Sequence, residues 1–400
     1  MRNILAAQIR VGGVTGSPRA GAARPTVLWS GRLLLLFALF VLASGSLCHR
    51  PIVHHGFECI TPDDSLSFEP CIACNANGHV VLAWTRNLSG KEDIWFVEKD
   101  SGGDWSEPVN LSQSGTGYGS RSISLCFDQT GTLHAAWSQA LEFGWVILYT
   151  WRQAGGGWAV PETVRLGLPI YPHIGVAASG YVHLFFQDAS GAGSNPCYAT
   201  RAPSGEWSQV TELRSGYLCR DLAPFMHQDG RCIVAYVERD SAHALGRVHW
   251  LSGSGDAWSA PALLDSLSNA PVFVQMTGMG GTSYLGYVWL GKIRVWSQVE
   301  SSGWRGPDTL CPRNGAPAMI SLAPLAVSDL IAAWSDAHSL EMMLARRASA
   351  WSETVVVAGS DSTNPWHTSL TIAPDGLIHL VWAGGDPEHS KVFYTSLRIE

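Results

Sequence analysis

The sequence predicts an all-β fold, a seven-bladed β-propeller of four-stranded antiparallel blades. Two aromatic landmarks recur in step at intervals of roughly 50 residues, the size of one blade. The first is an aromatic residue that ends an alternating strand, and the second is a Trp that opens a later strand. The first falls at Trp84, Trp137, Phe186, Tyr236, Trp289, Trp334 and Trp382, and the second at Trp105, Trp158, Trp207, Trp258, Trp304 and Trp351.

Composition and periodicity support this fold class. The 400 residues include 42 Gly and 18 Trp, and only 15% are charged, which is typical of a chain with ample core material and many tight turns. No apolar period of 3.6 residues persists over a dozen residues, so crossover helices and a parallel sheet are excluded. The net charge of -7 is spread without long runs of one sign, which excludes nucleic acid as an expected partner.

Residues 1–47 are predicted to be a signal peptide. Arginines precede the apolar run Leu33 to Ala43, which is too short to span a bilayer comfortably, and small residues follow where cleavage is expected near residues 45–47. We therefore expect a secreted or cell-surface protein with no transmembrane span in the mature chain. Cys48 closely follows the apolar run, which leaves a lipid anchor at Cys48 open, although Leu47 stands where a lipoprotein signal has a small residue.

The propeller is predicted to cover residues 51–400. The last repeat stops after its third strand, so we expect residues 51–60 to supply the missing outer strand of that blade and close the ring. A closed ring of this kind is expected to be a monomer. The predicted blades are 62–115, 116–167, 168–215, 216–266, 267–312, 313–359 and 360–400 together with 51–60.

Residues that recur at one position in many blades are interpreted as building the blades. The two Trp series are expected to pack between neighbouring blades. His134, His183 and His379 each lie three residues before the strand-ending aromatic, in different blades, and are expected to be structural rather than metal ligands. Cys71 and Cys74 have metal-clip spacing but lie on a predicted strand, where residues three apart point to opposite faces. We expect no metal site and no cofactor.

Residues that do not recur, at positions facing one rim, are the candidates for a site. In an antiparallel unit the start of strand one and the end of strand two lie at the same rim. Arg121 and Arg220 share one repeat position two blades apart, which suits a grip on a carboxylate, although each arginine can instead pair with Asp221 or Glu69. The candidate ligand-binding residues are Arg121, Arg220, Tyr171, Trp366, His367, Asp188, Glu238 and Asp336.

Gly-rich turns before the second Trp carry a family resemblance over residues 62–400. The turns read DSGGDW (100–105), QAGGGW (153–158), APSGEW (202–207) and GSGDAW (253–258). The chain resembles the sialidase-like propellers with Asp-box (BNR) repeats, with boxes that are shorter and lack the regular Asp.

In that family the resemblance implies three arginines on the substrate carboxylate, a Tyr and Glu pair and an acid Asp. Tyr171 is then a candidate nucleophile, and Asp221 or Glu69 a candidate acid or base. A third arginine at an inner-strand start and the Phe-Arg-Ile-Pro signature are absent from this sequence.

The sequence leaves three functions open. The first is a non-catalytic secreted or surface-anchored propeller that binds a glycan or a protein on one rim. The second is an exo-acting, sialidase-like glycoside hydrolase, which needs two carboxyl groups, or a Tyr and a Glu, about 5 to 10 Å apart near the axis. The third is a structural scaffold with no pocket on its rim.

Overall fold

A computed structural model describes the chain at residues 52–54, 56–61, 66–115, 118–190, 194–215, 219–240, 245–300, 302–312, 315–358, 364–385 and 389–399. The chain divides into two units, Met1–His49 and Arg50–Glu400, and the described residues all belong to the second. The predicted signal peptide and Cys48 lie outside the described residues. Among the residues that are described, no helix is long and apolar enough to span a membrane.

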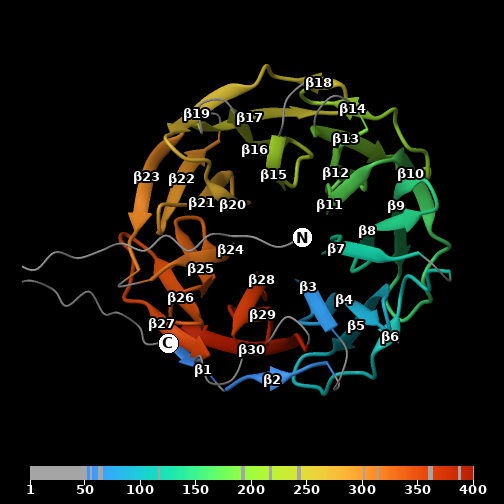
Figure 1. Ribbon diagram of the computed structural model, residues 1–400, viewed down its shortest axis with the longest axis horizontal. Helices are drawn as coiled ribbons and strands as arrows, with labels where there is room; N and C mark the ends of the chain where they lie inside the picture. The colour runs from blue at the N-terminus through green and yellow to red at the C-terminus, as the bar shows by residue number, and fades with distance from the viewer. Residues whose placement is uncertain are drawn as a thin grey trace, which may run out of the picture. The chain divides into compact units, whose positions relative to one another are not determined.

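Seven antiparallel sheets stand around one axis, which confirms the predicted seven-bladed propeller (Figure 1). Within each blade the first strand is the innermost and the later strands follow outward. Blades one to three consist of β3 (Leu66–Cys74), β4 (Val80–Leu88), β5 (Lys91–Lys99) and β6 (Val109–Asn110); β7 (Ser120–Phe127), β8 (Leu133–Leu141), β9 (Gly144–Arg152) and β10 (Glu162–Gly167); and β11 (Pro169–Val176), β12 (Val182–Asp188), β13 (Asn195–Arg201) and β14 (Thr211–Glu212).

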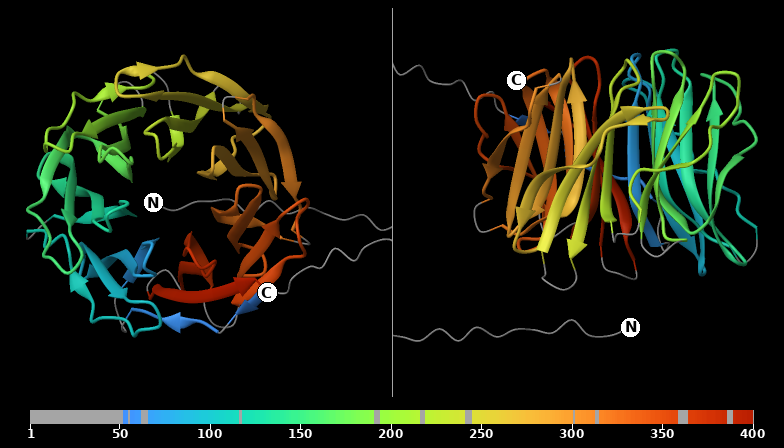
Figure 2. Two further views of the ribbon diagram at one scale, coloured as in Figure 1. Left: turned by 180° about the vertical axis from the view of Figure 1, so that it is seen from behind. Right: turned by 90° about the horizontal axis from the view of Figure 1, so that it is seen from above.

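Blades four to seven repeat this order, and Figure 2 shows the blades from behind and from the side. They consist of β15 (Cys219–Met226), β16 (Cys232–Asp240) and β17 (Leu245–Ser254) with β18 (Ala257–Trp258) and β19 (Ala262–Leu267); β20 (Val272–Met279), β21 (Thr282–Trp289), β22 (Lys292–Val299) and β23 (Arg305–Leu310); β24 (Pro317–Ala326), β25 (Asp329–Asp336), β26 (Glu341–Arg347) and β27 (Val355–Ala358); and β28 (Pro365–Ile372), β29 (Ile378–Gly384) and β30 (Lys391–Ile399).

The N-terminal segment closes blade seven, as the sequence predicts. β1 (Ile52–His54) and β2 (Glu58–Cys59) both pair antiparallel with β30 and take the place of its outer strand. Beyond β2, Ile60 donates its N–H to the Val392 carbonyl at 2.8 Å. Figure 1 shows these two N-terminal strands beside β30 at the edge of the ring. The first and last parts of the propeller therefore share one sheet, so that blade seven has no open edge there.

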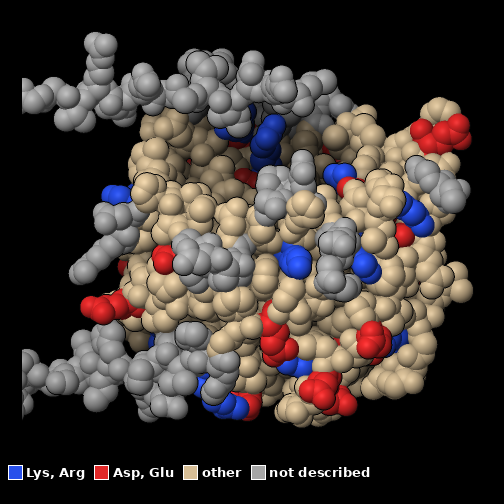
Figure 3. Space-filling model, turned by 60° about the horizontal axis from the view of Figure 1, so that its bottom comes forward, with Lys and Arg blue, Asp and Glu red and all other residues tan. Residues whose placement is uncertain are grey.

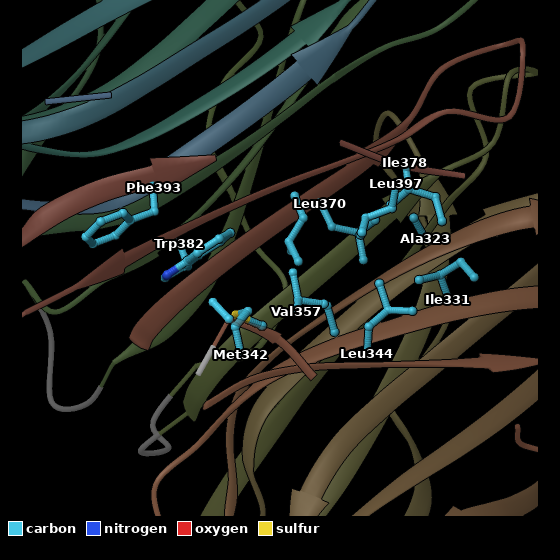
Figure 4. Close-up of a cluster of buried hydrophobic side chains, with 13 residues drawn as sticks. Ala323, Ile331, Met342, Leu344, Val357, Leu370, Ile378, Trp382, Phe393 and Leu397 are labelled. Carbon is cyan, nitrogen blue, oxygen red and sulfur yellow. The ribbon is translucent and has the colours of Figure 1, made fainter. Parts of the chain in front are cut away.

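The second strand of each blade is the most deeply buried. β12, β25 and β29 are buried along their whole length, because neighbouring blades cover both faces of the sheet. Figure 4 shows one such layer, where Met342 and Leu344 of blade six meet Leu370 and Trp382 of blade seven.

The Trp series packs between blades, which is the structural role that the sequence predicts. The second-landmark Trp of a blade meets an aromatic ring on strand three of the preceding blade, edge to face. Trp105 contacts Tyr394 with ring centroids 5.0 Å apart, and Trp258 contacts Tyr198 at 4.9 Å. The same arrangement joins Trp158 to Phe96, Trp207 to Tyr149 and Trp304 to Trp250.

Blade five departs from the predicted landmark. Its buried strand-two aromatic is Tyr287, which is fully buried, and Trp289 lies half-buried two residues later. The reason is a short first hairpin, in which only Gly280 and Gly281 separate the paired residues Met279 and Thr282. The strand register therefore shifts relative to the other blades.

Each inner strand carries a β-bulge near its start, and the residue at the bulge has a positive φ. Hydrogen-bonded pairing skips there in all seven blades, as between Phe68 and Cys71 in blade one. Left-handed backbone is uncommon for residues other than Gly, and it re-aims the side chain at the bulge. The seven residues are Glu69, Ser122, Tyr171, Asp221, Phe273, Met319 and His367, with φ between 27° and 57°.

Candidate functional site

The seven bulges form a ring at one end of the propeller axis. Because every inner strand begins at this end, the bulge residues of neighbouring blades lie side by side. Figure 3 shows one face of the propeller hollowed near its centre, with basic and acidic side chains inside the hollow. We use the term axial cluster for the polar and aromatic members of the ring and the residues just before them: Glu69, Arg121, Tyr171, Arg220, Asp221, Trp366 and His367.

Glu69 links blade one to blade two. Its Oε2 accepts hydrogen bonds from the Ser122 N–H at 2.9 Å and from the Ser122 hydroxyl at 3.1 Å. A carboxylate that accepts a backbone N–H and a hydroxyl is held in one orientation. Glu69 also acts electrostatically on His367 across the junction with blade seven.

Asp221 repeats this arrangement between blades four and five. Its carboxylate accepts a hydrogen bond from the Phe273 backbone, as that of Glu69 does from Ser122. Burial raises the pKa of Asp221, because it disfavours the charged form, and the Arg220 charge only partly offsets this effect. Asp221 is therefore a carboxyl group that holds its proton to higher pH than an exposed aspartate.

Tyr171 lies close enough to the charged groups of the axial cluster for each of them to affect the pKa of its phenol. Its side chain is 49% exposed, yet partial burial raises the pKa of its phenol. The charges of Glu69 and Asp221 add to this rise, and Arg121 and Arg220 oppose it. All four charged groups therefore act on one phenol, although they come from three different blades.

The two arginines of the cluster differ in their partners. Arg121 makes a bidentate ion pair with Glu92, with Nη2 2.7 Å from Oε1, and this pairing raises the pKa of its guanidinium. Arg220 is exposed, and within the described part of the chain no carboxylate forms an ion pair with it. Of the two predicted carboxylate-binding arginines, Arg220 is the one that is available to a ligand.

Glu92, the ion-pair partner of Arg121, was not predicted from the sequence. It lies at the start of strand three, just after the hairpin that turns at this rim, whereas only strand-one starts and strand-two ends were considered. Gly119 leaves space for it, since a Cβ there would lie 3.2 Å from Glu92 Oε2. Glu92 lies two residues after Gly90, whose positive φ forms a tight turn, and this position in the sequence could have indicated that Glu92 lies at this rim.

Trp366 and His367 lie together at the start of blade seven, as predicted. Their ring centroids are 4.9 Å apart with planes tilted by 44°. His367 Nδ1 is buried and has no hydrogen-bond partner among the described residues. Burial lowers the pKa of His367, while the Glu69 charge raises it, so this ring is neutral at neutral pH.

Three predicted ligand-binding carboxylates instead have local partners. Asp188 bonds Arg165 Nε at 2.8 Å and the Ser190 N–H at 2.9 Å. Asp336 accepts backbone N–H groups of its own loop and of the preceding linker, including Ala316 at 2.8 Å. Both side chains therefore stabilise loops.

Glu238 is the third of these carboxylates. It is buried 3.6 Å from both Arg247 Nη1 and His249 Nε2. Like Asp188 and Asp336, it has no contact with the axial cluster among the interactions of the described residues.

The axial cluster has donors for an anionic group, an aromatic surface, and a carboxyl group, Asp221, whose pKa is raised by burial. Arg220 can hold a carboxylate, and Tyr171 and Trp366 can contact the faces or hydroxyls of a sugar ring. Across the described residues, no group of three or more His, Cys, Asp or Glu is arranged to hold a metal ion.

No protein-family model and no curated protein matches the sequence. Solved structures do match in fold. The NanB sialidase from Streptococcus pneumoniae has 12% identity over 86% of this chain and 71% of its own, with a TM-score of 0.53. The polysaccharide lyase Uly1 has 11% identity over 85% of this chain and 92% of its own, at 0.54.

The α-L-arabinofuranosidase Arb93A from Fusarium graminearum has 13% identity over 86% of this chain and 98% of its own, with a TM-score of 0.53. At these identities the comparisons show a common propeller fold. The chain thus has a sialidase-like propeller fold that resembles those of these glycoside hydrolases and of the lyase.

Proposed function

We propose that this propeller binds an acidic glycan at the axial cluster, with Arg220 holding the carboxylate of the sugar. The observation that carries the proposal is Arg220 itself, an exposed arginine at the axis without an ion pair among the described residues, beside Tyr171 and Asp221. A guanidinium matches a carboxylate in a bidentate geometry. The carbohydrate-active enzymes that share the fold add support from analogy.

Binding to a glycan panel tests this proposal. The purified protein should bind uronic-acid or sialic-acid glycans in preference to neutral ones. Arg220→Ala should weaken that binding about tenfold or more, because it removes a charge-assisted contact. Arg305→Ala is the matched control, since Arg305 is also exposed but lies on the outer strand β23. Equal binding of acidic and neutral glycans would refute the assignment.

Hydrolysis of the bound glycan is the second candidate, in the manner of an exo-acting sialidase-like enzyme. The observation that favours it is the difference between the two carboxyl groups: Asp221 has a raised pKa, and Glu69 is fixed by Ser122. A protonated acid and an oriented carboxylate or phenol are the pair that glycoside hydrolysis uses. Asp221 would then be the acid, and Tyr171 with Glu69 the nucleophilic pair.

Turnover of fluorogenic sialosides and other aryl glycosides distinguishes binding from catalysis. A hydrolase should lose turnover in Asp221→Asn and Tyr171→Phe, while both variants keep glycan affinity within a few-fold. Absence of turnover at high protein concentration, with glycan binding intact, identifies a binding propeller. Secretion, attachment through Cys48, a monomeric state and a protein ligand stay predictions from the sequence.

A further inference from the structure

A polar cavity lies on the opposite end of the propeller from the axial cluster. It has a volume of about 340 Å³ and lies between blades seven and one. The first hairpin turns of both blades line it, at Asn77 and Asp375, where the inner strands end rather than begin. We use the term seam cavity for this space, whose polar lining includes Asn77, Lys99, Ser101, Asp375, His379 and Tyr394.

Lys99 is unusual among the cations at equivalent places between blades. Lys99, Arg152 and Arg201 are each the last residue of strand three and face the aromatic rings of the preceding blade. Arg152 is paired with Glu98, and Arg201 with Glu162.

Lys99 Nζ instead lies 4.4 Å from the Trp105 ring centre and 4.2 Å from that of Tyr394. Among the described residues no carboxylate lies within 4 Å of it. Glu58 and Asp104 act on it only at longer range.

His379 offers a second group to the same cavity. It is 3% exposed, its Nδ1 lies 2.8 Å from the Tyr394 hydroxyl, and its Nε2 is buried with no hydrogen-bond partner in the described chain. The Ser396 side chain hydrogen-bonds Tyr394. The Ser396 hydroxyl donates to the Tyr394 oxygen, and the Tyr394 hydroxyl donates to His379 Nδ1. Because Nδ1 accepts this hydrogen bond, the proton of the neutral His379 imidazole is on Nε2.

Blade two shows what is missing at this place in blade seven. There the corresponding His134 Nε2 lies 3.6 Å from the Asp128 carboxylate, which is an electrostatic contact rather than a hydrogen bond. Asp128 lies six residues before His134, and the residue six before His379 is Ala373, which lines the seam cavity. A buried donor without its acceptor is costly unless a ligand or water supplies one.

We propose that the seam cavity binds a small molecule bearing an oxyanion group, held by Lys99 Nζ and His379 Nε2–H. Lys99 and His379 both line this cavity, and an oxyanion can accept hydrogen bonds from an ammonium and from an imidazole N–H. The acids at the rim of the cavity are already engaged, since Asp375 pairs with Arg398 at 2.5 Å and Asp100 lies 2.8 Å from His79 Nδ1. The site is independent of the proposed glycan site at the axis.

Isothermal titration calorimetry with acetate and with inorganic sulfate, at a fixed ionic strength set by chloride, tests the proposal on the purified protein. The wild-type protein should bind at least one of them saturably, and Lys99→Met should weaken that binding about tenfold or more. Binding of acetate alone identifies a carboxylate site, and binding of sulfate alone a site for tetrahedral oxyanions.

Two variants separate loss of the site from loss of the fold. Ala76→Phe fills the cavity from an exposed turn while keeping Lys99, and it should abolish binding without lowering the unfolding temperature. Lys292→Met removes an exposed lysine of blade five and should bind like wild type. Absence of binding by both probes, or full binding by folded Lys99→Met or Ala76→Phe, overturns the proposal.

Discussion

At the scale of single residues, the polar groups of this propeller differ mainly in whether the fold already supplies their partner. Arg121 and Arg220 occupy the same repeat position, yet Glu92 pairs with the first and no described carboxylate pairs with the second. Sequence position identified both arginines, but it did not identify Glu92, because that contact crosses from strand three of one blade to strand one of the next. The position of a residue in the repeat thus predicts where its side chain lies, but it does not predict whether another residue already pairs with it.

Asp221→Asn tests the half-buried acid of the axial cluster. A raised folded-state pKa means that the ionised form of Asp221 is disfavoured in the fold, so the contribution of this one group to stability is fully present below the unfolded value of 3.8 and is lost as pH rises through the folded pKa. Asn keeps an acceptor for the Phe273 backbone without the charge. Urea unfolding should therefore show Asp221→Asn at least as stable as wild type at pH 7, with a smaller advantage at pH 4. A less stable variant at pH 7 would contradict the burial account.

Two buried histidines predict how the stability of the fold changes as the pH is lowered. Burial lowers the pKa of both His183 and His379 from 6.5 to about 4, and both are 3% exposed. The unfolded chain therefore binds more protons than the fold between those values, so stability is lost as pH falls from about 6.5 to about 4.

Urea unfolding between pH 7.5 and pH 4.5 measures this loss. It should amount to a few kcal/mol, on the order of 1.4 kcal/mol per pKa unit for each histidine. Replacement of both histidines by Gln should reduce that slope, and an unchanged slope in the variant would contradict the assignment.

At the scale of the strand and its turns, the seven bulges are the feature that builds the axial site. Alternating strands, hairpin turns and the Trp series could all be read from the sequence, because each depends on local patterns or a repeated residue. The bulges could not, since the residue at each one differs in type, from Glu69 to Met319, and none is a Gly. The same applies to the shorter hairpin of blade five, which moved the landmark to Tyr287.

Ser122 tests the backbone at a bulge. Its φ is 57°, in the left-handed region, where a β-branched side chain is strongly disfavoured. Ser122→Val should destabilise the protein by about 1 to 3 kcal/mol relative to Ser122→Gly in chemical unfolding. Both variants lose the hydroxyl that bonds Glu69, so the difference between them isolates the backbone. Equal stability would show that the bulge relaxes when the residue changes.

At the scale of the whole molecule, closure depends on a shared blade. The sequence predicted the closing strand from an incomplete last repeat, and β1 and β2 on β30 confirm it. The same closure brings Lys99 of blade one against Tyr394 of blade seven, beside the seam cavity. The sequence analysis did not predict that the junction between blades seven and one differs from the other junctions. The difference arises because blade one has Lys99 at the position where blades two and three have Arg152 and Arg201.

Removal of β1 and β2 tests how much the closure of blade seven contributes to the stability of the propeller. A chain from Arg50 to Glu400 contains the whole propeller, and a chain from Pro62 lacks β1 and β2 and exposes β30 as an edge. The shorter chain should unfold at a markedly lower temperature or associate through the open edge. Thermal unfolding and light scattering of the two chains measure both effects. Equal unfolding temperatures and equal monomer content would show that closure contributes little.

The central claim is that Arg220 holds the carboxylate of an acidic glycan at the axis. Calorimetric titration of one acidic glycan and its carboxyl-reduced counterpart, into wild type and Arg220→Ala, tests it as a double-mutant cycle. We predict that reduction of the carboxyl and loss of Arg220 each weaken binding about tenfold or more, and that the two losses together exceed neither one alone. Losses that simply add would place the carboxylate elsewhere and contradict the account.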